Sequence, residues 1–431
     1  MTDMPRWTSA TARWVARLTA RPFVVRGLAL LVIAWGSYKL IAPRLHQDDV
    51  HWLVDLQVYQ GAGVAVTNGH SLYDYTTPFP QLLPFTYPPF GGLLAIPLSL
   101  LKRHPLGIVW TFLELATLMF VVWKLFRPLL VRAGAHAPIL YAGLLVAAEF
   151  LMPVRDTFYF GQVNLFLLGL VVTDLTVVRG KWPRGLLIGL AAAIKLTPGL
   201  FIPYLWMTGR RRMAGVAAAT FVGAQLLAAA IIPSDSYRYW TSTVFEGQRL
   251  GLNTVVTNQA IRGMLLRFAL PAPFGSLLWV ALAAPVAVIG LRRAQRAYAD
   301  GALLASVGMV GLTTCLVSPV SWIHHFVWAL VVIAGLVGDG RDRRRLWWAT
   351  GLAVAYTSKA VYWGQEFVTG NGSYVIGRVV QETYLVLTLF VVLALPWRRE
   401  ILASVDAGQL VSAETAPVPD GEAASRPVVT P

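Results

Sequence analysis

Apolar runs of about 20 residues recur through the sequence, and they constrain the fold more than any other feature. A helix needs about 20 such residues to cross the hydrocarbon core of a bilayer. Lipid offers the backbone no hydrogen-bond partner, so each crossing segment must be helical. The candidate spans are residues 24–42, 86–101, 106–126, 138–152, 158–178, 185–207, 213–232, 271–291, 301–318, 323–337, 345–362 and 375–396. The sequence therefore predicts an all-α, polytopic transmembrane protein of about 12 helices.

The charged residues support this class and indicate an orientation. Only 13% of the 431 residues are charged, against about 25% in soluble proteins. The net charge is +15, but the basic residues form short clusters between apolar runs rather than a single nucleic-acid-binding patch. Such clusters are typical of cytoplasmic loops that face anionic lipid. They occur at Arg210–Arg212, Arg292–Arg296, Arg341–Arg345 and Arg398–Arg399, which predicts that both termini are cytoplasmic.

The pattern divides the chain into three regions. Residues 1–23 form a basic cytoplasmic N-terminus, and the apolar run that follows has no small-residue cleavage site, so we expect an uncleaved signal anchor. Residues 24–397 form the transmembrane domain, with a long first periplasmic loop at 43–85. Within this loop, Trp52–Val66 could form an interfacial helix. Residues 398–431 are rich in Pro, Ala, Glu and Val, and we expect a disordered cytoplasmic tail.

The middle of the chain is compatible with two topologies. Four crossings between residues 102 and 210 give twelve in total, but they place the basic group Arg179–Arg184 outside, against the positive-inside rule. A short, broken or re-entrant helix near residues 138–160 would restore the charge bias.

Asp55 is the strongest candidate for chemistry, because it is an acid in the first outer loop, at the membrane surface. On a helix, Asp55, Val58 and Tyr59 would share one face. A carboxylate there can take a proton from a substrate hydroxyl. The alternative is a solvated loop acid. Tyr87, in the segment FTYPPF at Phe85–Phe90, can offer a hydroxyl to the same outer boundary.

Lys195 is the most unusual polar residue within the predicted spans. It follows ten residues of the apolar stretch GLLIGLAAAIKLTPGLFIPYLW, and we expect Pro198 to interrupt the helix and free backbone groups. A lysine at such a position costs at least about 2.5 kcal/mol. A buried ammonium needs an anion, and a lipid phosphate is the obvious one in a membrane. The alternative is that the side chain extends to the interface.

Two further segments place polar groups in apolar surroundings. Gln162 and Asn164, in GQVN, are amides that either bridge helices or line a cavity. His324 and His325 end the segment SPVSWIHH. Adjacent side chains on a helix point about 100° apart, so we do not expect both histidines to chelate one metal. One of them can face the cavity while the other packs or meets lipid headgroups, and the sequence leaves open which one does so. The sequence has no GxxxxGK[ST], GxGxxG, HExxH or CxxC motif, which removes the main support for ATP-driven, dinucleotide-dependent or zinc-hydrolase functions.

The acidic first loop with VYQGAG, followed by FTYPPF, GQVN, KLTP and SPVSWIHH, forms an ordered set over roughly residues 50–330. In this set the chain resembles glycosyltransferase family 87, the actinobacterial polyprenol-phosphate-mannose-dependent α-mannosyltransferases of the GT-C class. The length and the first loop are most similar to the PimE type, which extends phosphatidylinositol mannosides with α-1,2-linked mannose.

The resemblance implies a donor, an acceptor and residue roles. The donor is polyprenyl-phosphate-mannose, the acceptor is a glycolipid of the phosphatidylinositol mannoside class, and transfer inverts the anomeric carbon on the periplasmic side of the inner membrane. The family's catalytic acid corresponds to Asp55. The residues assigned to the donor and its phosphate are Lys195, His324, His325, Gln162, Asn164 and Tyr87, and those assigned to the acceptor are Tyr59 and Asp49. We expect no cofactor or metal, although Asp48, Asp49 and Asp55 would allow a divalent ion to bind.

Two alternatives remain at this point. The chain could be a transporter or flippase of an anionic or lipid-linked substrate, with Lys195 as its charged site, or a non-catalytic membrane scaffold. In the simple twelve-crossing topology, GQVN begins near the cytoplasmic end of its helix, far from Asp55. A donor-binding role for Gln162 and Asn164 therefore requires the re-entrant topology.

Overall fold

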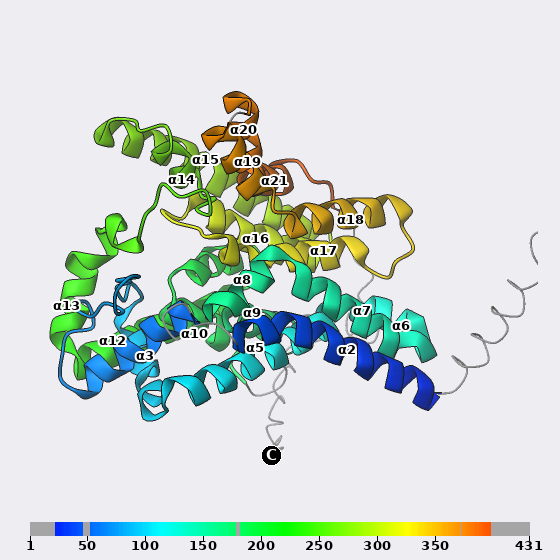
Figure 1. Cartoon of the computed structure of the whole chain (residues 1–431), viewed down its shortest axis with the longest axis horizontal. Helices are drawn as coiled ribbons and strands as arrows, with labels where there is room; N and C mark the ends of the chain where they lie inside the picture. Colours follow the sequence, from blue (N-terminus) through cyan, green and yellow to red (C-terminus); the bar gives the residue numbers. More distant parts are fainter. Residues whose placement is uncertain (1–21, 46–51, 178–181, 371, 398–431) are drawn as a thin grey trace, which may run out of the picture. The chain divides into compact units, whose positions relative to one another are not determined.

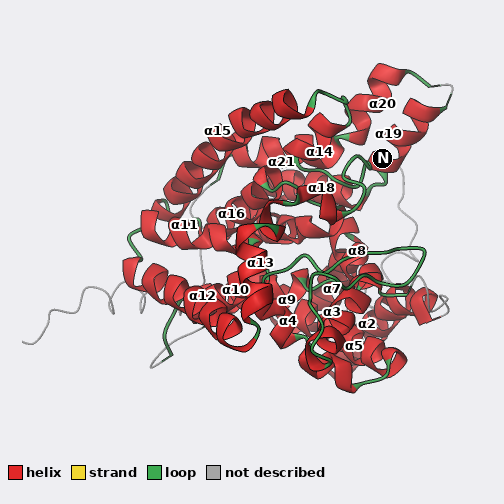
Figure 2. Cartoon of the chain, turned by 90° about the vertical axis from the view of Figure 1, so that its left-hand side faces the viewer, coloured by secondary structure: helices red, strands yellow, loops and turns green. Residues whose placement is uncertain are grey.

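A computed structural model describes residues 22–45, 52–177, 182–370 and 372–397. All of these residues belong to one compact unit, Met1–Glu400. The described chain consists of helices and loops, with two isolated β-bridges at Thr76–Pro84 and Asn258–Trp322 (Figure 2). The prediction of an all-α protein is therefore confirmed. Asp48 and Asp49, the basic N-terminus up to residue 21, Arg179, Lys181 and the predicted tail 398–431 lie outside the described residues.

Five helical segments in the described chain are long and apolar enough to cross a membrane. They are α2 (Pro22–Leu45), α5 (Arg103–Leu125), the segment Arg127–Phe150 that contains α6 (Arg127–Ala133) and α7 (Ala137–Phe150), α12 (Arg211–Ile231) and α15 (Ala272–Ala299). Two bent helix pairs raise the number to seven if each pair is one span. These helices support a polytopic membrane protein, and the figure of twelve crossings stays a prediction.

Proline residues break two of the expected spans. Residues 86–101 form α4 (Pro89–Leu94) and the 3₁₀ helix η1 (Ile96–Leu100), which contains Pro97. Residues 185–207 form α10 (Leu186–Ile194), η3 (Thr197–Leu200) and α11 (Phe201–Met207), with Pro198 in the break. Proline lacks the backbone N–H that a continuing helix requires and its ring clashes with the preceding turn. The expectation of one continuous helix over 86–101 is therefore wrong, whereas the interruption expected at Pro198 is confirmed.

The sharpest bend lies at the GQVN segment. There α8 (Met152–Phe160) and α9 (Asn164–Thr176) meet at 119°. Gly161 ends α8 in the left-handed conformation, with φ of 68°, which glycine adopts without steric cost. The bend is a broken span or a re-entrant segment. It lies immediately after residues 138–160, near which such a segment was expected from the basic group Arg179–Arg184.

Helix α3 (Val54–Thr67) carries Asp55 in its first turn. It spans 14 residues, which is too short to cross a bilayer, and it matches the helix predicted over Trp52–Val66. Gly61 and Gly63 let the backbone approach its neighbours, because a Cβ at these positions would lie within 2.3 Å of the Tyr75 ring or the Ala95 carbonyl oxygen. Helix α3 also lies against α5, where Gly107 accommodates the Trp52 ring (Figure 1).

The C-terminal helices surround the SPVSWIHH segment. They are α16 (Leu303–Val317), η6 (Ile323–Trp328), α17 (Ala329–Val337), α18 (Arg343–Thr357), α19 (Ala360–Thr369), α20 (Tyr374–Gln381) and α21 (Thr383–Leu393). Helices α20 and α21 meet at a 54° bend, and Glu382 occupies the break. The remaining elements, from the outer loop between α12 and α15, are α13 (Pro233–Thr241), η4 (Thr243–Phe245), η5 (Gly247–Leu250) and α14 (Ile261–Leu266).

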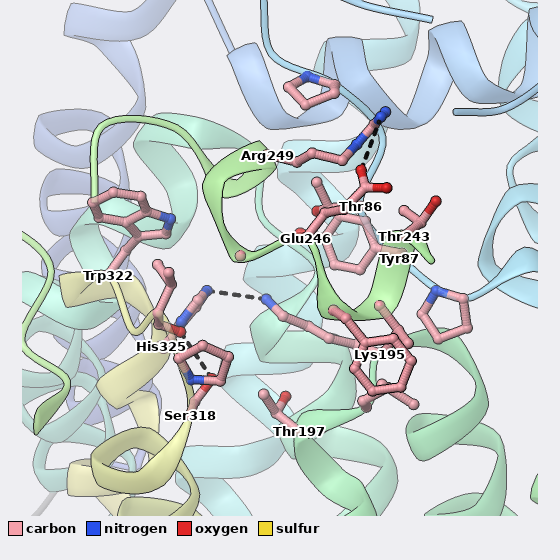
Figure 3. Close-up of a pocket in the computed structure, with 18 of the residues that line it drawn as sticks. Thr86, Tyr87, Lys195, Thr197, Thr243, Glu246, Arg249, Ser318, Trp322 and His325 are labelled. Carbon is pink, nitrogen blue, oxygen red and sulfur yellow. Dashed lines mark hydrogen bonds and ion pairs between the residues drawn. The ribbon is translucent and has the colours of Figure 1, made fainter. Parts of the chain in front are cut away.

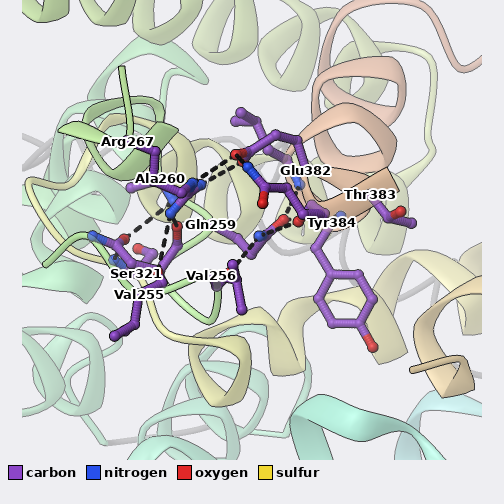
Figure 4. A network of polar contacts seen from close by, with 12 residues as sticks. Val255, Val256, Gln259, Ala260, Arg267, Ser321, Glu382, Thr383 and Tyr384 are labelled. Atoms are coloured by element: carbon purple, nitrogen blue, oxygen red, sulfur yellow. Dashed lines mark hydrogen bonds and ion pairs between the residues drawn. The ribbon is translucent and has the colours of Figure 1, made fainter. Parts of the chain in front are cut away.

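A buried polar network fixes this region (Figure 4). Arg267 Nε donates to Glu382 Oε1 at 2.7 Å, and the two side chains are only 4% and 10% exposed. The Gln259 backbone N–H donates to the Ser321 carbonyl at 2.8 Å, and the Gln259 side-chain oxygen accepts from the Tyr384 N–H at 3.1 Å. The network therefore ties the outer loop to both the α20–α21 break and the loop that precedes the two histidines.

Replacing Glu382 tests how much the fold depends on this network. Glu382→Ala leaves Arg267 buried without its carboxylate partner, so we expect the free energy of unfolding to fall by about 3–5 kcal/mol. The measurement is the melting temperature of purified protein in detergent. Asp339→Ala, which removes a partner of the exposed Arg341, is the matched control and should change the melting temperature little. Equal melting temperatures for Glu382→Ala and wild type would contradict this role.

Candidate active site

A cavity of about 370 Å³ collects the candidate residues from segments far apart in the sequence (Figure 3). Its lining includes Asp55, Tyr87, Gln162, Lys195 and His325. These come from α3, the FTYPPF segment, the α8–α9 bend, the break after α10 and the start of η6. The bend therefore brings GQVN to the same side as Asp55, and the conflict raised by the simple twelve-crossing topology does not arise.

Asp55 is half-buried at the cavity wall. Burial raises the pKa of its carboxyl group to about 6, while a hydrogen bond with the Gln162 side chain and the charge of Lys195 act in the opposite direction. The carboxylate is thus ionised at neutral pH. A base whose pKa lies near the working pH combines the correct protonation state with a useful affinity for the proton.

The Gln162 side chain forms hydrogen bonds with both Asp55 and Lys195. Its side-chain oxygen accepts from the Tyr59 hydroxyl at 2.9 Å, and its side-chain nitrogen donates to the Tyr87 hydroxyl at 3.2 Å. The hydroxyls of Tyr59 and Tyr87 are themselves 2.9 Å apart. These contacts hold the amide in one orientation, and only 3% of Gln162 is exposed.

Tyr59 takes a position different from the one expected for an acceptor-binding residue. Its hydroxyl is engaged by Gln162 and Tyr87, and its ring packs against Trp110 of α5 at 5.8 Å between centroids. Tyr59 is buried behind the cavity rather than among the described residues that line it. Its position therefore indicates that Tyr59 orients the Gln162 side chain rather than contacting a substrate. Asp49, the other residue assigned to the acceptor, lies outside the described residues.

Lys195 occupies the end of α10, where the chain becomes extended ahead of Pro198. The carbonyl end of a helix favours a cation. Its ammonium donates to Asn164 Oδ1 at 2.9 Å and lies 3.1 Å from His325 Nε2 and 3.5 Å from Gln162 Oε1. The described side chains that it contacts are amides, an imidazole and the Tyr87 ring, with no carboxylate among them. This cation, 8% exposed, can therefore bind an anion that enters the cavity.

The two histidines have different surroundings. His325 lines the cavity beside Lys195, and because the ammonium is a donor, His325 Nε2 acts as the acceptor. His324 points elsewhere: its ring packs against Phe160 at 5.3 Å, and it is not among the described residues that line the cavity. Its backbone carbonyl accepts from Asn164 Nδ2 at 2.9 Å. The donor-binding role expected for His324 is thus not supported by its position, because in η6 adjacent side chains diverge.

Asn164 also lies behind the cavity wall. It accepts from Lys195 through its oxygen and donates to the His324 carbonyl through its nitrogen. It therefore orients the ammonium and fixes η6, and its position does not indicate direct contact with a substrate. Among the described residues, no group of three or more His, Cys, Asp or Glu side chains could hold a metal ion.

Five residues that line the cavity were not predicted from the sequence. They come from η5 and the residue before it, from α14 and α15, and from the loop before η6, and they are Glu246, Arg249, Arg262, Trp279 and Trp322. Arginines are rare on the outer side under the positive-inside rule, so the four in the outer loop 233–270, of which Arg249 and Arg262 line the cavity, were a usable signal.

Comparison with known proteins gives a consistent result. The sequence model of glycosyltransferase family 87 matches residues 85–319. The chain is 34% identical, over 73% of its length and 76% of the relative's, to the polyprenol-phosphate-mannose-dependent alpha-(1-2)-phosphatidylinositol mannoside mannosyltransferase of Mycobacterium tuberculosis. It is 33% identical to the protein of the same name from Mycolicibacterium smegmatis, over 76% of this chain and 79% of that one.

A third relative, the alpha-(1-2)-phosphatidylinositol pentamannoside mannosyltransferase of Mycolicibacterium smegmatis, is 34% identical over 66% of this chain and 69% of its own length. No solved structure matches the chain. The matched region contains Tyr87, the GQVN bend and Lys195, and it ends shortly before His325. On these matches, the chain belongs to glycosyltransferase family 87.

Proposed function

We propose that this protein transfers mannose from polyprenol-phosphate-mannose to a hydroxyl of a phosphatidylinositol mannoside, forming an α-1,2 linkage. The observation that carries the proposal is that Asp55 and the buried ammonium of Lys195 line one cavity. The relatives named above are all mannosyltransferases that depend on polyprenol-phosphate-mannose. Nothing in these comparisons supports the transporter or the scaffold alternative.

Asp55 acts as the general base in this proposal. The acceptor hydroxyl lies within hydrogen-bond reach of the carboxylate, which takes its proton as the oxygen attacks the anomeric carbon of the donor mannose. The new bond joins the acceptor oxygen to this carbon. The bond between the carbon and the phosphate oxygen breaks, and polyprenyl phosphate leaves with the electron pair. The family resemblance implies a β-linked donor, so one displacement gives the α product.

Lys195 stabilises the leaving phosphate. Negative charge accumulates on the phosphate oxygen as the glycosidic bond breaks, and donors already in position stabilise that charge strongly in a site shielded from water. Lys195 and His325 are adjacent, with their nitrogen atoms 3.1 Å apart, and both line the cavity. We expect them to fulfil this role without a metal ion or another cofactor.

The active site faces the periplasm in this proposal, and the termini face the cytoplasm. The basic clusters support this orientation, because they lie at the ends of α12 and α15 that are remote from the cavity. Arg211 begins α12, a helix of 21 residues and so about 30 Å long, and the next residue that lines the cavity, Tyr239, follows the other end of α12. Trp279, near the start of α15, lines the cavity, whereas Arg292–Arg296 are in its last turns. Basic ends lie preferentially in the cytoplasm.

Asp55→Asn should lower the rate of mannosyl transfer by a factor of about 10²–10⁴, because an amide cannot accept the proton. The assay measures transfer of labelled mannose from polyprenol-phosphate-mannose to phosphatidylinositol mannosides by purified protein. Asp74→Asn is a matched control, since Asp74 belongs to the same outer loop but is 69% exposed. Transfer by Asp55→Asn at a near wild-type rate would refute the general-base assignment.

The pH dependence should show the same group. The pKa of Asp55 is raised to about 6, so lowering the pH through 6 protonates the base and removes its activity. We expect kcat/KM to be level above this pH and to fall about tenfold per pH unit below it. A profile that stays flat from about pH 7 to about pH 5 would contradict the assignment.

Lys195→Ala should weaken donor binding more than acceptor binding, because it removes the charge that faces the phosphate. We expect the KM for the donor to rise and kcat to fall by about 10²–10³, with the KM for the acceptor little changed. Lys359→Ala, which removes an exposed lysine outside this cavity, serves as the control. An equal increase in both KM values would argue against a phosphate-binding role.

A further inference from the structure

One wall of the cavity is not used by the steps described so far. It consists of Thr243 in η4, Arg249 in η5 and Glu246 between these two helices. Trp322 lines the same cavity at the left of the view in Figure 3. We propose that the space between Trp322 and the Glu246–Arg249 pair binds the terminal sugar ring of the acceptor. The inference rests on the proposed function and specifies which part of the cavity receives the acceptor.

The Glu246–Arg249 pair is held in place by the outer loop. Arg249 Nη2 donates to the backbone carbonyl of Tyr73, and Arg249 Nη1 lies 3.5 Å from Glu246 Oε2. The Glu246 side chain remains 43% exposed, so its carboxylate oxygens can accept further hydrogen bonds. The pair therefore presents fixed donors next to fixed acceptors.

The same wall contains buried groups whose hydrogen-bonding capacity is unused. Thr243 is 6% exposed, and its hydroxyl has no hydrogen-bond partner among the described residues. The Nε of Arg249 is buried and is likewise unpaired within the described chain. A buried polar group without a partner costs about 1–3 kcal/mol. A ligand rich in hydroxyl groups would remove this cost.

Trp322 supplies an aromatic surface that is fixed from behind. The residue before it, Ser321, donates its backbone N–H to Asn258 Oδ1 at 3.0 Å, and Trp322 itself forms a backbone bridge with Asn258. The ring borders the end of the η5 segment, since a Cβ built on Gly251 would lie 3.9 Å from it. The face of an indole ring carries partial negative charge, which favours contact with the C–H groups of a sugar ring.

The charges of this wall distinguish a sugar from a phosphate. The Glu246 carboxylate would repel an anion, while Arg249 is paired with it and the nearby Arg262 lies over the Trp279 ring, 5.2 Å from its centroid. Lys195, by contrast, has no carboxylate among its contacts with the described residues. A sugar hydroxyl both donates and accepts hydrogen bonds, so it can satisfy the carboxylate and the guanidinium at the same time.

The position of the wall favours the acceptor sugar over the donor sugar. Donor mannose is bonded directly to the phosphate and must remain near Lys195. The Glu246 wall borders solvent, since the charged Glu246 side chain is itself 43% exposed. An acceptor headgroup with several sugars must extend into water, and this side of the cavity allows it to do so.

The test compares substrate binding by wild type and by Glu246→Gln and Trp322→Leu, with purified full-length protein in lipid nanodiscs. Each variant should weaken binding of a phosphatidylinositol mannoside about tenfold and leave the affinity for polyprenyl phosphate within about twofold. Methyl α-mannoside, a soluble probe, should compete with the acceptor for wild type and compete about tenfold less well for the variants. Glu366→Gln, at an exposed residue outside the cavity, should change neither affinity.

Unchanged acceptor affinity in both variants would overturn the inference, as would a loss confined to polyprenyl phosphate. Because binding is measured without turnover, the result does not depend on catalysis. A wild-type protein that binds the acceptor through this wall but transfers no mannose would refute the proposed function and leave the sugar site standing. Equal melting temperatures of variants and wild type would show that the loss is local.

Discussion

An ammonium group can remain in apolar surroundings only if polar groups surround it. The polar groups around the Lys195 ammonium come from distant parts of the chain. Asn164 and Gln162 come from the α8–α9 bend, and His325 comes from η6. The bend between α8 and α9 and the extended chain after α10 bring these groups together. The breaks at Gly161 and ahead of Pro198 therefore allow one buried cation to be solvated and the motifs to converge on one cavity.

The polar groups around the cavity form two layers with different tasks. Asp55, Lys195 and His325 reach the cavity, whereas Tyr59, Asn164 and the Arg267–Glu382 pair hold the inner residues and their loops in place. Because the second layer lies in poorly hydrated surroundings, each of its hydrogen bonds has few competitors and each broken one is costly. This arrangement gives short motifs on separate helices a fixed geometry without any β-sheet among the described residues.

Much of the fold and part of the site could be predicted from the sequence, because a polar residue in an apolar run stands out. Gln162, Lys195 and His325 were found in this way, Asp55 was found as an acid beside aromatic residues in the first outer loop, and all four line the cavity. Glu246 was not found, because no motif around it distinguished it from the other charged residues of its loop. The helix break in 86–101 was missed because hydropathy averages over a window and does not register where a helix stops, whereas Pro198 indicated the break in 185–207.

The sequence by itself determined the helical class, the membrane environment and the family. These depend on hydropathy, charge and short motifs, which can be read along the chain without knowledge of how it folds. Only the tertiary structure decided which histidine faces the cavity, that Tyr59 lies behind it, and that an outer-loop wall faces Trp322. These outcomes depend on the direction of side chains in a 3₁₀ helix and on contacts between residues more than 100 positions apart, such as Tyr59 and Gln162. No local pattern encodes such contacts, because packing of the whole chain sets them.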